Sequence, residues 1–518
     1  MSKRNELPVL LASLAITGAL LGGGAWWITK SVTGGGTPIS RSITADGTTR
    51  LTLLGDTFSG YSTFRNDDFQ AALREADIEI EYADEFDQTL RAEQLSEGKA
   101  DLIVTTLDQF VKQQPDGKIV GLLDRTVGAD AVVLNTKKYA GLDSLLKLGE
   151  LVKQEKAQGR TLSIAYAADT PSEYLALVLD TKFDTFNLSD FELKPVAEAS
   201  EAWTLMQDAN ENVAIAVLWE PYVTQARQQG YNVVLSSEDA PNAIVDVIVA
   251  SDDLIESDPA VISQLLESYY RRIDANARDA PQLQTQVAED GNLSVGDSAA
   301  IINGIDFFTA TETQDWFDAG TLDRRISATA AVLTLSNKLD AVPDNASELY
   351  TDQFVAAAAE NTQTLIELVR ADNPDLADKL EGHSNTVTAT PAISAAAIQQ
   401  APDIGNLQVR GQVGFATGSA DLTAEGKETL NQLAGEIQEF NQRTVAVRVI
   451  GHTSRTGAAD LNQSLSQQRA SVVVNHLKGM GVKLNILPEG KGFSEPLPNI
   501  DPADSRNQRT EIRLVRVN

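Results

Sequence analysis

The stretch that decides the fold of the last part of the chain is Gly451-His452-Thr453-Ser454-Arg455-Thr456-Gly457, followed by Asn462-Gln463-Ser464-Leu465-Ser466-Gln467-Gln468-Arg469-Ala470. The first segment predicts a polar turn bounded by glycines. The second predicts a helix, because apolar residues recur at helical spacing: Leu461, Leu465, Val472, Val473 and Leu477. Asn462, Ser466 and Arg469 share one helical face. A guanidinium fits a carboxylate in a bidentate fork, so this face predicts a carboxylate-binding site.

This stretch resembles the peptidoglycan-binding domain of the outer membrane protein A (OmpA) family. The family's helix motif is complete from Asn462 to Ala470, an opening strand and turn match at Val413–Leu422, and a late segment matches at Asn507–Arg509. The resemblance implies an α+β domain at 406–518 that binds the diaminopimelate of the peptidoglycan stem. By the same resemblance, the binding residues are Arg469, Asn462, Ser454, Thr453 and Arg509. Ser454 stands where the family usually has Asp.

Composition limits the functions open to the chain. It has 518 residues, a net charge of −31 and no cysteine. Such acidity argues against binding nucleic acid or an anionic membrane surface, and the lack of cysteine excludes disulfides, thiolate catalysis and Cys-type zinc sites. Three scattered histidines do not indicate a metal site. We find no nucleophile elbow and no phosphate-binding loop. We therefore expect a binding protein that is not an enzyme and has no cofactor.

The first 30 residues predict one N-terminal transmembrane helix. Lys3 and Arg4 precede an apolar run, Pro8–Thr29, that ends with Trp26-Trp27. The run is long enough for a bilayer core of about 30 Å, and the flanking charges favour a cytoplasmic N-terminus. We expect a single-pass inner-membrane anchor with the bulk of the chain in the periplasm; the alternative is a cleaved signal sequence. Residues 31–48 predict a spacer.

Residues 49–370 alternate short apolar strands with helices, which indicates an α/β fold with a mostly parallel sheet. Ligands bind at the carboxyl ends of strands in such sheets. The turn after Gly55 and the Thr105-Thr106 pair both lie at strand ends.

This region resembles the type 2 periplasmic substrate-binding proteins of ABC importers, in particular those for nitrate, sulfonates and thiamine precursors. Four features carry the resemblance: the small-polar turn at Ser59–Tyr61, Gly98-Lys99-Ala100-Asp101, Thr170-Pro171-Ser172, and Trp219-Glu220-Pro221-Tyr222. It implies two lobes around a cleft and these solute-binding residues: Ser59, Tyr61, Thr105, Thr106, Asp130, Thr170, Ser172, Trp219 and Glu220. A Glu220 that faces the cleft favours a cationic or hydroxylated ligand. The alternatives are that Thr170 only caps a helix and that Trp219 only packs.

Residues 371–405 are rich in Ala, Ser, Thr and Pro and predict a flexible linker. The leading hypothesis is an envelope protein that binds a small solute in the cleft and attaches non-covalently to peptidoglycan. The alternative is a scaffold or sensor whose lobes recognise a protein partner. A conventional importer component is a third possibility.

Overall fold

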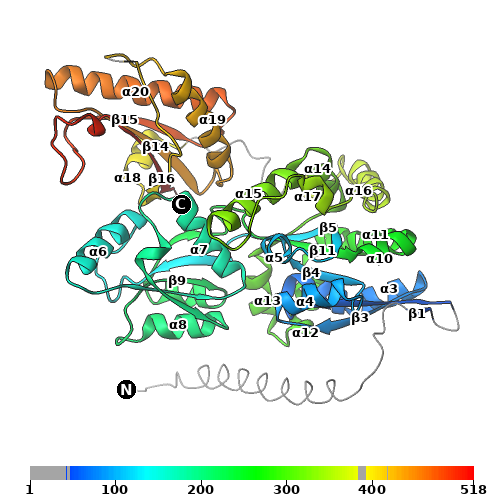
Figure 1. The fold of residues 1–518 in the computed structure, drawn as a ribbon. Helices are drawn as coiled ribbons and strands as arrows, with labels where there is room; N and C mark the ends of the chain where they lie inside the picture. The colour runs from blue at the N-terminus through cyan, green and yellow to red at the C-terminus, as the bar shows by residue number, and fades with distance from the viewer. Residues whose placement is uncertain (1–41, 44–46, 383–392, 417, 518) are drawn as a thin grey trace, which may run out of the picture.

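The computed structural model describes residues 42–43, 47–382, 393–416 and 418–517. The predicted transmembrane helix and most of the predicted spacer lie outside these ranges. None of the helices within them combines the length and apolar character that crossing a bilayer requires. In the part of the chain that the structure describes, the strands form three sheets (Figure 1).

The first lobe is built on a seven-stranded sheet whose order among the described residues is β1-β2-β4-β11-β5-β12, with β3 on β2. Its strands are β1 Ser42–Ile43, β2 Thr49–Gly55, β3 Ile78–Asp84, β4 Leu102–Thr106, β5 Gly117–Thr126, β11 Val245–Ser251 and β12 Ile305–Phe307. Strands β2, β3 and β4 are parallel, whereas β11 runs antiparallel to both β4 and β5. The prediction of a mostly parallel sheet is therefore wrong here, because the chain returns from the second lobe through β11 in the opposite direction.

Helices cover this sheet and extend beyond it. They are α2 Ser62–Arg65, α3 Asp67–Glu75, α4 Gln88–Ser96, α5 Leu107–Gln113, α10 Asp252–Ser257, α11 Pro259–Arg278, α12 Ala280–Asp290, α13 Val295–Ile302, α14 Ala310–Asp318, α15 Thr321–Leu335, α16 Ala356–Val369 and α17 Pro374–Leu380. The short helices η1 Ser59–Tyr61 and η3 Ala346–Leu349 complete the lobe. Helix α15 packs against α5 of the first lobe and α7 of the second, so it bridges the two.

The second lobe has a five-stranded sheet, in the order β10-β6-β9-β7-β8 over the described residues. The strands are β6 Asp130–Leu134, β7 Ser163–Ala167, β8 Glu192–Val196, β9 Val213–Trp219 and β10 Asn232–Ser236, and the helices are α6 Leu145–Ala157, α7 Pro171–Lys182, η2 Leu188–Asp190, α8 Ala199–Gln207 and α9 Tyr222–Gln228. The chain enters this lobe between β5 and β6 and leaves it between β10 and β11. The Thr126 amide donates to the Ile244 carbonyl (3.2 Å), so the two crossings lie side by side.

The C-terminal domain contains a sheet with helices packed on it. Over the described residues this sheet has four strands, in the order β13-β16-β14-β15. Its elements are α18 Ala395–Gln400, β13 Asp403–Asn406, α19 Ala424–Gln438, β14 Val445–His452, α20 Ala459–Gly479, β15 Ile486–Gly492, η4 Ser505–Asn507 and β16 Thr510–Arg516. The predicted linker, 371–405, differs from a continuous coil: α17 lies near its start, and α18 and the beginning of β13 lie near its end.

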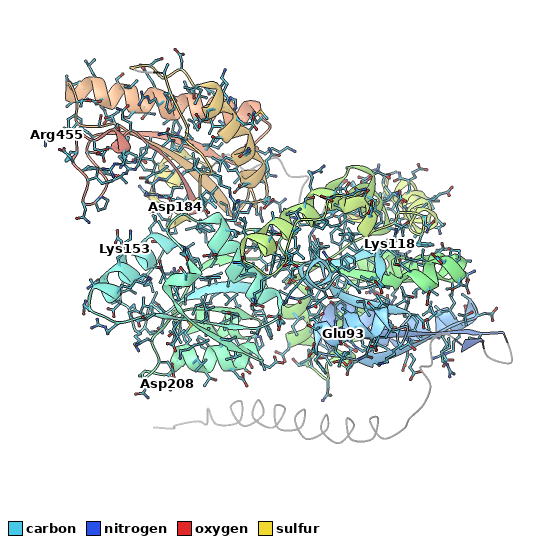
Figure 2. The ribbon with its side chains drawn as sticks, viewed as in Figure 1. Glu93, Lys118, Lys153, Asp184, Asp208 and Arg455 are labelled. Atoms are coloured by element: carbon cyan, nitrogen blue, oxygen red, sulfur yellow. The ribbon has the colours of Figure 1, made fainter. Side chains whose placement is uncertain are left out.

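The C-terminal domain packs directly on the second lobe. One hydrophobic cluster contains Leu145 and Phe183 of the lobe together with Ile404 and Leu407 of the domain. Backbone hydrogen bonds cross the contact beside them, from the Asp184 amide to the Asn406 carbonyl (3.1 Å) and from the Gln408 amide to the Lys182 carbonyl (2.8 Å). Figure 2 shows Asp184 at this junction.

Polar contacts extend the junction to both sides. Glu439, just beyond α19, lies 3.7 Å from Lys182 of α7 and 3.4 Å from Arg325 of α15. On the other side, Asn441 donates its amide to the Asp239 carbonyl (2.8 Å) and its side-chain N–H to the Glu238 carbonyl (2.9 Å). A shared core with a hydrogen-bonded border orders the second lobe and the domain as one packed unit.

Candidate functional site

The turn after β14 is held against helix α20 by a very close approach. A Cβ atom built on Gly451 would lie 2.4 Å from the Ser466 carbonyl oxygen, so only glycine fits there without moving the helix. The Ser466 hydroxyl accepts the Gly492 amide at 2.9 Å, which ties the same helix to the end of β15. The predicted helix face thus lies directly over the strand ends.

Arg469 is the centre of this arrangement. Its Nε donates to the Ser419 carbonyl at 3.0 Å, and its Nη1 lies 3.5 Å from Gln508 Oε1. The guanidinium carbon lies 4.9 Å from the centre of the Phe415 ring, a distance at which a cation is attracted to the ring face. The residue is only 5% exposed, and burial lowers the pKa of Arg469 from its ordinary value. The loop before α19, the turn before β16 and α20 therefore converge on one guanidinium.

Arg469 makes no ion pair with any described residue. Other arginines of the same domain do: Arg448 pairs with Asp403 and Glu489, and Arg513 pairs with Asp403 and Glu511. A buried charge without a counter-charge is costly, and a carboxylate ligand would supply one. This contrast distinguishes Arg469 as the anion-binding candidate.

Ser454 is linked to Arg469 through Gln508. The Gln508 Nε2 donates to the Ser454 hydroxyl at 3.2 Å, while its Oε1 faces Arg469. The Ser454 hydroxyl also lies 3.2 Å from Thr456 Oγ1. The sequence analysis did not select Gln508, although its position between the matching Asn507 and Arg509 was a signal for it.

Asn462 and Thr453 lie beside this network. The Asn462 Nδ2 donates to the carbonyls of Thr456 (2.8 Å) and Ala458 (3.1 Å), so the amide shapes the turn. The Thr453 amide donates to the Gly492 carbonyl, while its buried hydroxyl has no hydrogen-bond partner among the described residues. The Asn462 side chain and the Thr453 backbone thus support the turn, and the Thr453 hydroxyl is a buried polar atom without a partner in the described ranges.

Arg509 forms its ion pair with Glu511 and makes no contact with Arg469 among those recorded for the described residues. The Arg509 Nε and Nη2 donate to Glu511 Oε1 at 2.9 and 2.6 Å. The buried His452 ring places Nε2 3.3 Å from the same oxygen. Burial would raise the pKa of Glu511, but contact with His452 and the charges of Arg509 and Arg513 outweigh it and lower the pKa to about 2. Arg509 is thus held in a second, charge-balanced cluster.

In the first lobe, the predicted residue Tyr61 contacts one member of a pair of acids. Its hydroxyl donates to Asp246 Oδ1. Asp246 of β11 and Asp124 of β5 occupy paired positions on neighbouring strands. Burial, then the charge of Asp124, raises the pKa of Asp246 well above its ordinary value, and burial, then Asp306, raises the pKa of Asp124 to about 8.

The Thr105-Thr106 pair ends β4 as predicted. The Thr105 hydroxyl donates to Gln88 Oε1 at 2.9 Å, whereas the buried Thr106 hydroxyl has no hydrogen-bond partner among the residues described. Asp108 and Gln109 follow in α5, and the Gln109 Nε2 donates to Asp108 Oδ2 at 2.9 Å. Burial raises the pKa of Asp108 to about 6.

Of the predicted residues in the second lobe, Asp130 is influenced by the charge of Asp108 in the first lobe. Burial, then the charges of Asp108 and Glu220, raises the pKa of Asp130 to about 7. Glu220 accepts the amide and the hydroxyl of Thr224 at 3.0 and 2.9 Å, so it caps α9. Trp219, paired with Asp130 on the neighbouring strand, is half-buried.

The remaining candidates have mixed roles. The Thr170 hydroxyl accepts the Ser172 amide at 3.2 Å and donates to the Ala167 carbonyl at 2.8 Å, which is the helix-capping alternative. The buried Ser172 hydroxyl has no partner within the described ranges. Ser59 is half-buried in the turn after β2. The structure therefore brings Tyr61, Thr106 and Asp130 toward one acidic region and turns Thr105, Thr170 and Glu220 to local hydrogen bonds.

Sequence reasoning missed Asp108, Gln109, Asp124 and Asp246. For the last two a signal was present, because each is the single acidic residue of a largely buried strand. A charged residue on a fully buried strand needs a partner, and here the partners are another acid and a tyrosine.

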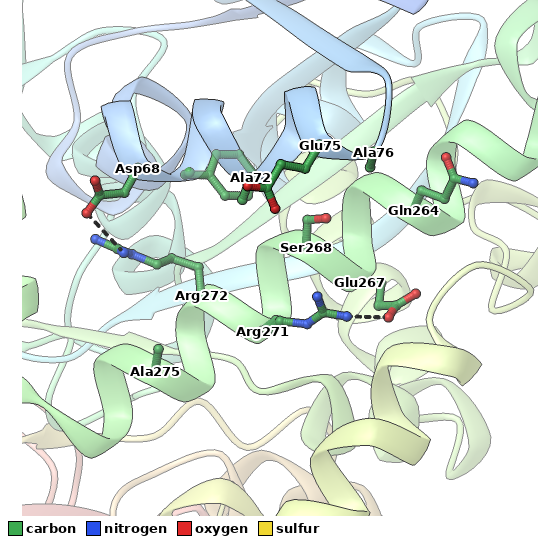
Figure 3. Close-up of a pocket in the computed structure, with 11 residues that line it drawn as sticks. Asp68, Ala72, Glu75, Ala76, Gln264, Glu267, Ser268, Arg271, Arg272 and Ala275 are labelled. Atoms are coloured by element: carbon green, nitrogen blue, oxygen red, sulfur yellow. Dashed lines mark hydrogen bonds and ion pairs between the residues drawn. The ribbon is translucent and has the colours of Figure 1, made fainter. Parts of the chain in front are cut away.

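A separate groove of about 460 Å³ lies between α3 and α11 (Figure 3). It is bordered by Arg272, 3.7 Å from Asp68, and by Arg271, 2.6 Å from Glu267. None of the predicted solute-binding residues lines it. Within the described residues, no cluster of His, Cys, Asp or Glu has the arrangement of a metal site.

Comparison with known proteins identifies the C-terminal domain. Residues 414–510 match the model of the OmpA family. The probable lipoprotein YiaD of Escherichia coli K12 is 38% identical over 111 residues, which are 21% of this chain and 50% of that protein. Outer membrane protein A of Shimwellia blattae is 33% identical over 105 residues, which are 20% of this chain and 43% of that protein. The chain thus spans half or less of these relatives, and the similarity concerns one domain.

Solved structures resemble the two lobes in their fold. The aliphatic sulphonate binding protein SsuA of Escherichia coli covers 58% of this chain and 92% of its own, with a TM-score of 0.46 and 14% identity. The match to the alkanesulfonate-binding protein SsuA of Xanthomonas axonopodis pv. citri covers 60% of this chain and 97% of that protein, with a TM-score of 0.42 and 14% identity. Both likenesses are low in identity and TM-score, so the description of the two lobes rests on the strand order and the adjacent crossings given above.

Proposed function

We propose that this protein is a cell-envelope protein that attaches non-covalently to peptidoglycan through Arg469. The observation that carries the proposal is the buried guanidinium of Arg469, which has no carboxylate partner among the described residues. A free carboxylate of the diaminopimelate stem would complete the pair as a charge-assisted, bidentate contact.

Two neighbours prepare Arg469 for such a ligand. The Ser419 carbonyl and the Phe415 ring hold the guanidinium in place, which reduces the entropy that binding would cost. The Ser454 hydroxyl is joined to it through Gln508. Arg509 stabilises the surrounding turn through Glu511 and acts indirectly.

The two lobes, in this proposal, bind a small solute between them. Their mixed sheets are joined at the two adjacent crossings, and buried polar groups of both lobes lie between them. The N-terminal segment would anchor the protein in the inner membrane with its bulk in the periplasm, so that one end is held by the membrane and the other by the wall.

Co-sedimentation of the full chain with purified peptidoglycan tests the wall-binding role. The wild-type protein is expected to pellet, and Arg469→Ala is expected to remain in solution. Arg506→Ala is the matched control, because the partner of this exposed arginine among the described residues is Asp504 and its loss changes the net charge equally. Equal pelleting of the wild type and Arg469→Ala would refute the role of Arg469.

A further inference from the structure

Four carboxyl groups from both lobes lie in one buried acidic region, defined by Asp108, Asp124, Asp130 and Asp246. Asp124 and Asp246 occupy paired strand positions. The charge of Asp108 acts on both Asp130 and Asp246, so these groups are close enough to influence one another across the boundary between the lobes. Each of the four is at most 7% exposed.

No described cation neutralises this acidic region. Asp108, Asp124, Asp130 and Asp246 form no ion pair with a described residue, and Lys112, the lysine whose charge reaches Asp108, pairs with Asp169. Carboxylates buried without a cation are costly, and the raised pKa values of Asp124 and Asp130 express that cost. A ligand cation would remove it.

Unpartnered polar atoms point to the same place. Both carboxyl oxygens of Asp124, the Thr106 hydroxyl and Gln109 Oε1 are buried and lack hydrogen-bond partners among the described residues. Thr106 lies opposite Asp246 on the neighbouring strand, and Gln109 already donates to Asp108. Buried polar atoms are rarely left unpaired in proteins, and these are mostly acceptors, so the missing partner is a donor.

Gly60 packs tightly against the acid pair. A Cβ atom at this position would lie 2.4 Å from Asp124 Oδ2 and 2.5 Å from the Phe58 ring. Only glycine therefore lets the η1 turn approach the Asp124 carboxyl this closely.

We propose that the acidic region binds a small organic cation with N–H donors, a primary ammonium or a guanidinium. This inference rests on the proposed solute-binding role of the lobes and names the chemical class of the solute. The carboxylates supply the counter-charge, and the unpartnered oxygens of Thr106 and Gln109 accept the N–H groups. An anionic solute would meet like charge at the same position.

Isothermal titration calorimetry of the full chain with putrescine and with agmatine tests the proposal. We expect saturable binding of at least one of them. Asp130→Asn and Asp246→Asn should each weaken it at least tenfold, because each removes a charge-assisted hydrogen bond. Glu93→Gln and Asp208→Asn, which alter one exposed acid on each lobe (Figure 2), should bind as the wild type does.

Several results would overturn the inference. The first is that neither amine binds saturably. The second is that Asp130→Asn binds the amine with unchanged affinity. The third is that tetramethylammonium, which has no N–H donor, or Ca²⁺ binds as tightly as the amine does. Saturable binding of ethanesulfonate in place of the amines would reject the cationic class and keep the solute-binding role. Should Asp246→Asn fail to fold, Asp130→Asn decides the outcome. Pelleting with peptidoglycan depends on Arg469 and is unaffected by these variants.

Discussion

Arg516, in the last strand of the chain, forms an ion pair with Asp239, which lies 277 residues earlier in the second lobe. Asp239 is 1% exposed and also accepts the Ser236 amide at 2.8 Å. A second N–H of Arg516 donates to the Val233 carbonyl at 2.7 Å. The carboxyl-terminal strand of the described chain is thereby joined to the edge strand β10, and the C-terminal domain has a fixed orientation on the lobe.

Removing the Asp239 carboxylate is expected to loosen this junction. Breaking one partner of a buried ion pair costs about 3 kcal/mol, so Asp239→Asn should reduce the hydrogen-exchange protection of the Asn441 and Gln408 amides by about 100-fold. Both amides donate across the junction. Asp504→Asn, which alters an exposed pair remote from it, should leave their protection unchanged. Unaltered protection in Asp239→Asn would mean that the hydrophobic contact alone holds the domain.

Ser454→Asp is expected to tighten the binding of peptidoglycan. The position lies in the polar network of Gln508 and Arg469, where a carboxylate would pair with the ammonium group of the stem. The gain of a charge-assisted over a neutral hydrogen bond is about 1 kcal/mol, or about fivefold in Kd. Quantitative pelleting over a range of peptidoglycan concentrations measures it, with Ser464→Asp on the exposed face of α20 as the control. An unchanged Kd would place the ammonium elsewhere.

Gly451→Ala is expected to destabilise the C-terminal domain by about 1–3 kcal/mol, because the new Cβ would overlap the backbone of α20 at Ser466. Gly435→Ala is the matched control. Gly435 lies inside α19 with nothing within 4 Å of a Cβ, so alanine should stabilise the helix by about 0.5–1 kcal/mol. Thermal unfolding of both variants measures whether the stability falls in Gly451→Ala and rises in Gly435→Ala. A loss of stability in both would show that helix packing at Gly451 is not the cause.

Glu511 is expected to make the domain sensitive to acid. The pKa of the Glu511 carboxyl is about 2 in the folded chain, against an ordinary value of 4.5. Between these two pH values, the folded state therefore binds fewer protons than the unfolded state. The stabilisation is complete above about pH 4.5 and is lost as the pH falls toward about 2.

The test compares wild type with Glu511→Gln by thermal unfolding from about pH 5.5 to about pH 3. The wild type should have the higher midpoint at the upper end, and the difference should shrink as the pH falls. A constant difference over the whole range would show that the Glu511 charge does not contribute to stability.

The sequence by itself determined the local elements of both regions. The helical spacing of Asn462, Ser466 and Arg469 placed them on α20, and Thr170 before Pro171 predicted the start of α7 correctly. These predictions succeeded because periodicity, capping and turn chemistry act over a few residues. Thr170 accordingly serves as the helix cap that was the alternative to a ligand contact.

Only the tertiary structure decided which side chains meet. Arg509 was expected beside Arg469 and pairs instead with Glu511 of β16, whose carboxylate also lies beside His452 of β14. Gln508 joins Ser454 to Arg469, and Asp124 is paired with Asp246, which lies 122 positions later in the chain, as the register of β5 and β11 shows. Strand register and domain packing depend on contacts between distant residues, so no local pattern encodes them. The sequence thus placed Arg469 on a helix face, and the fold buried its charge without an ion-pair partner among the described residues.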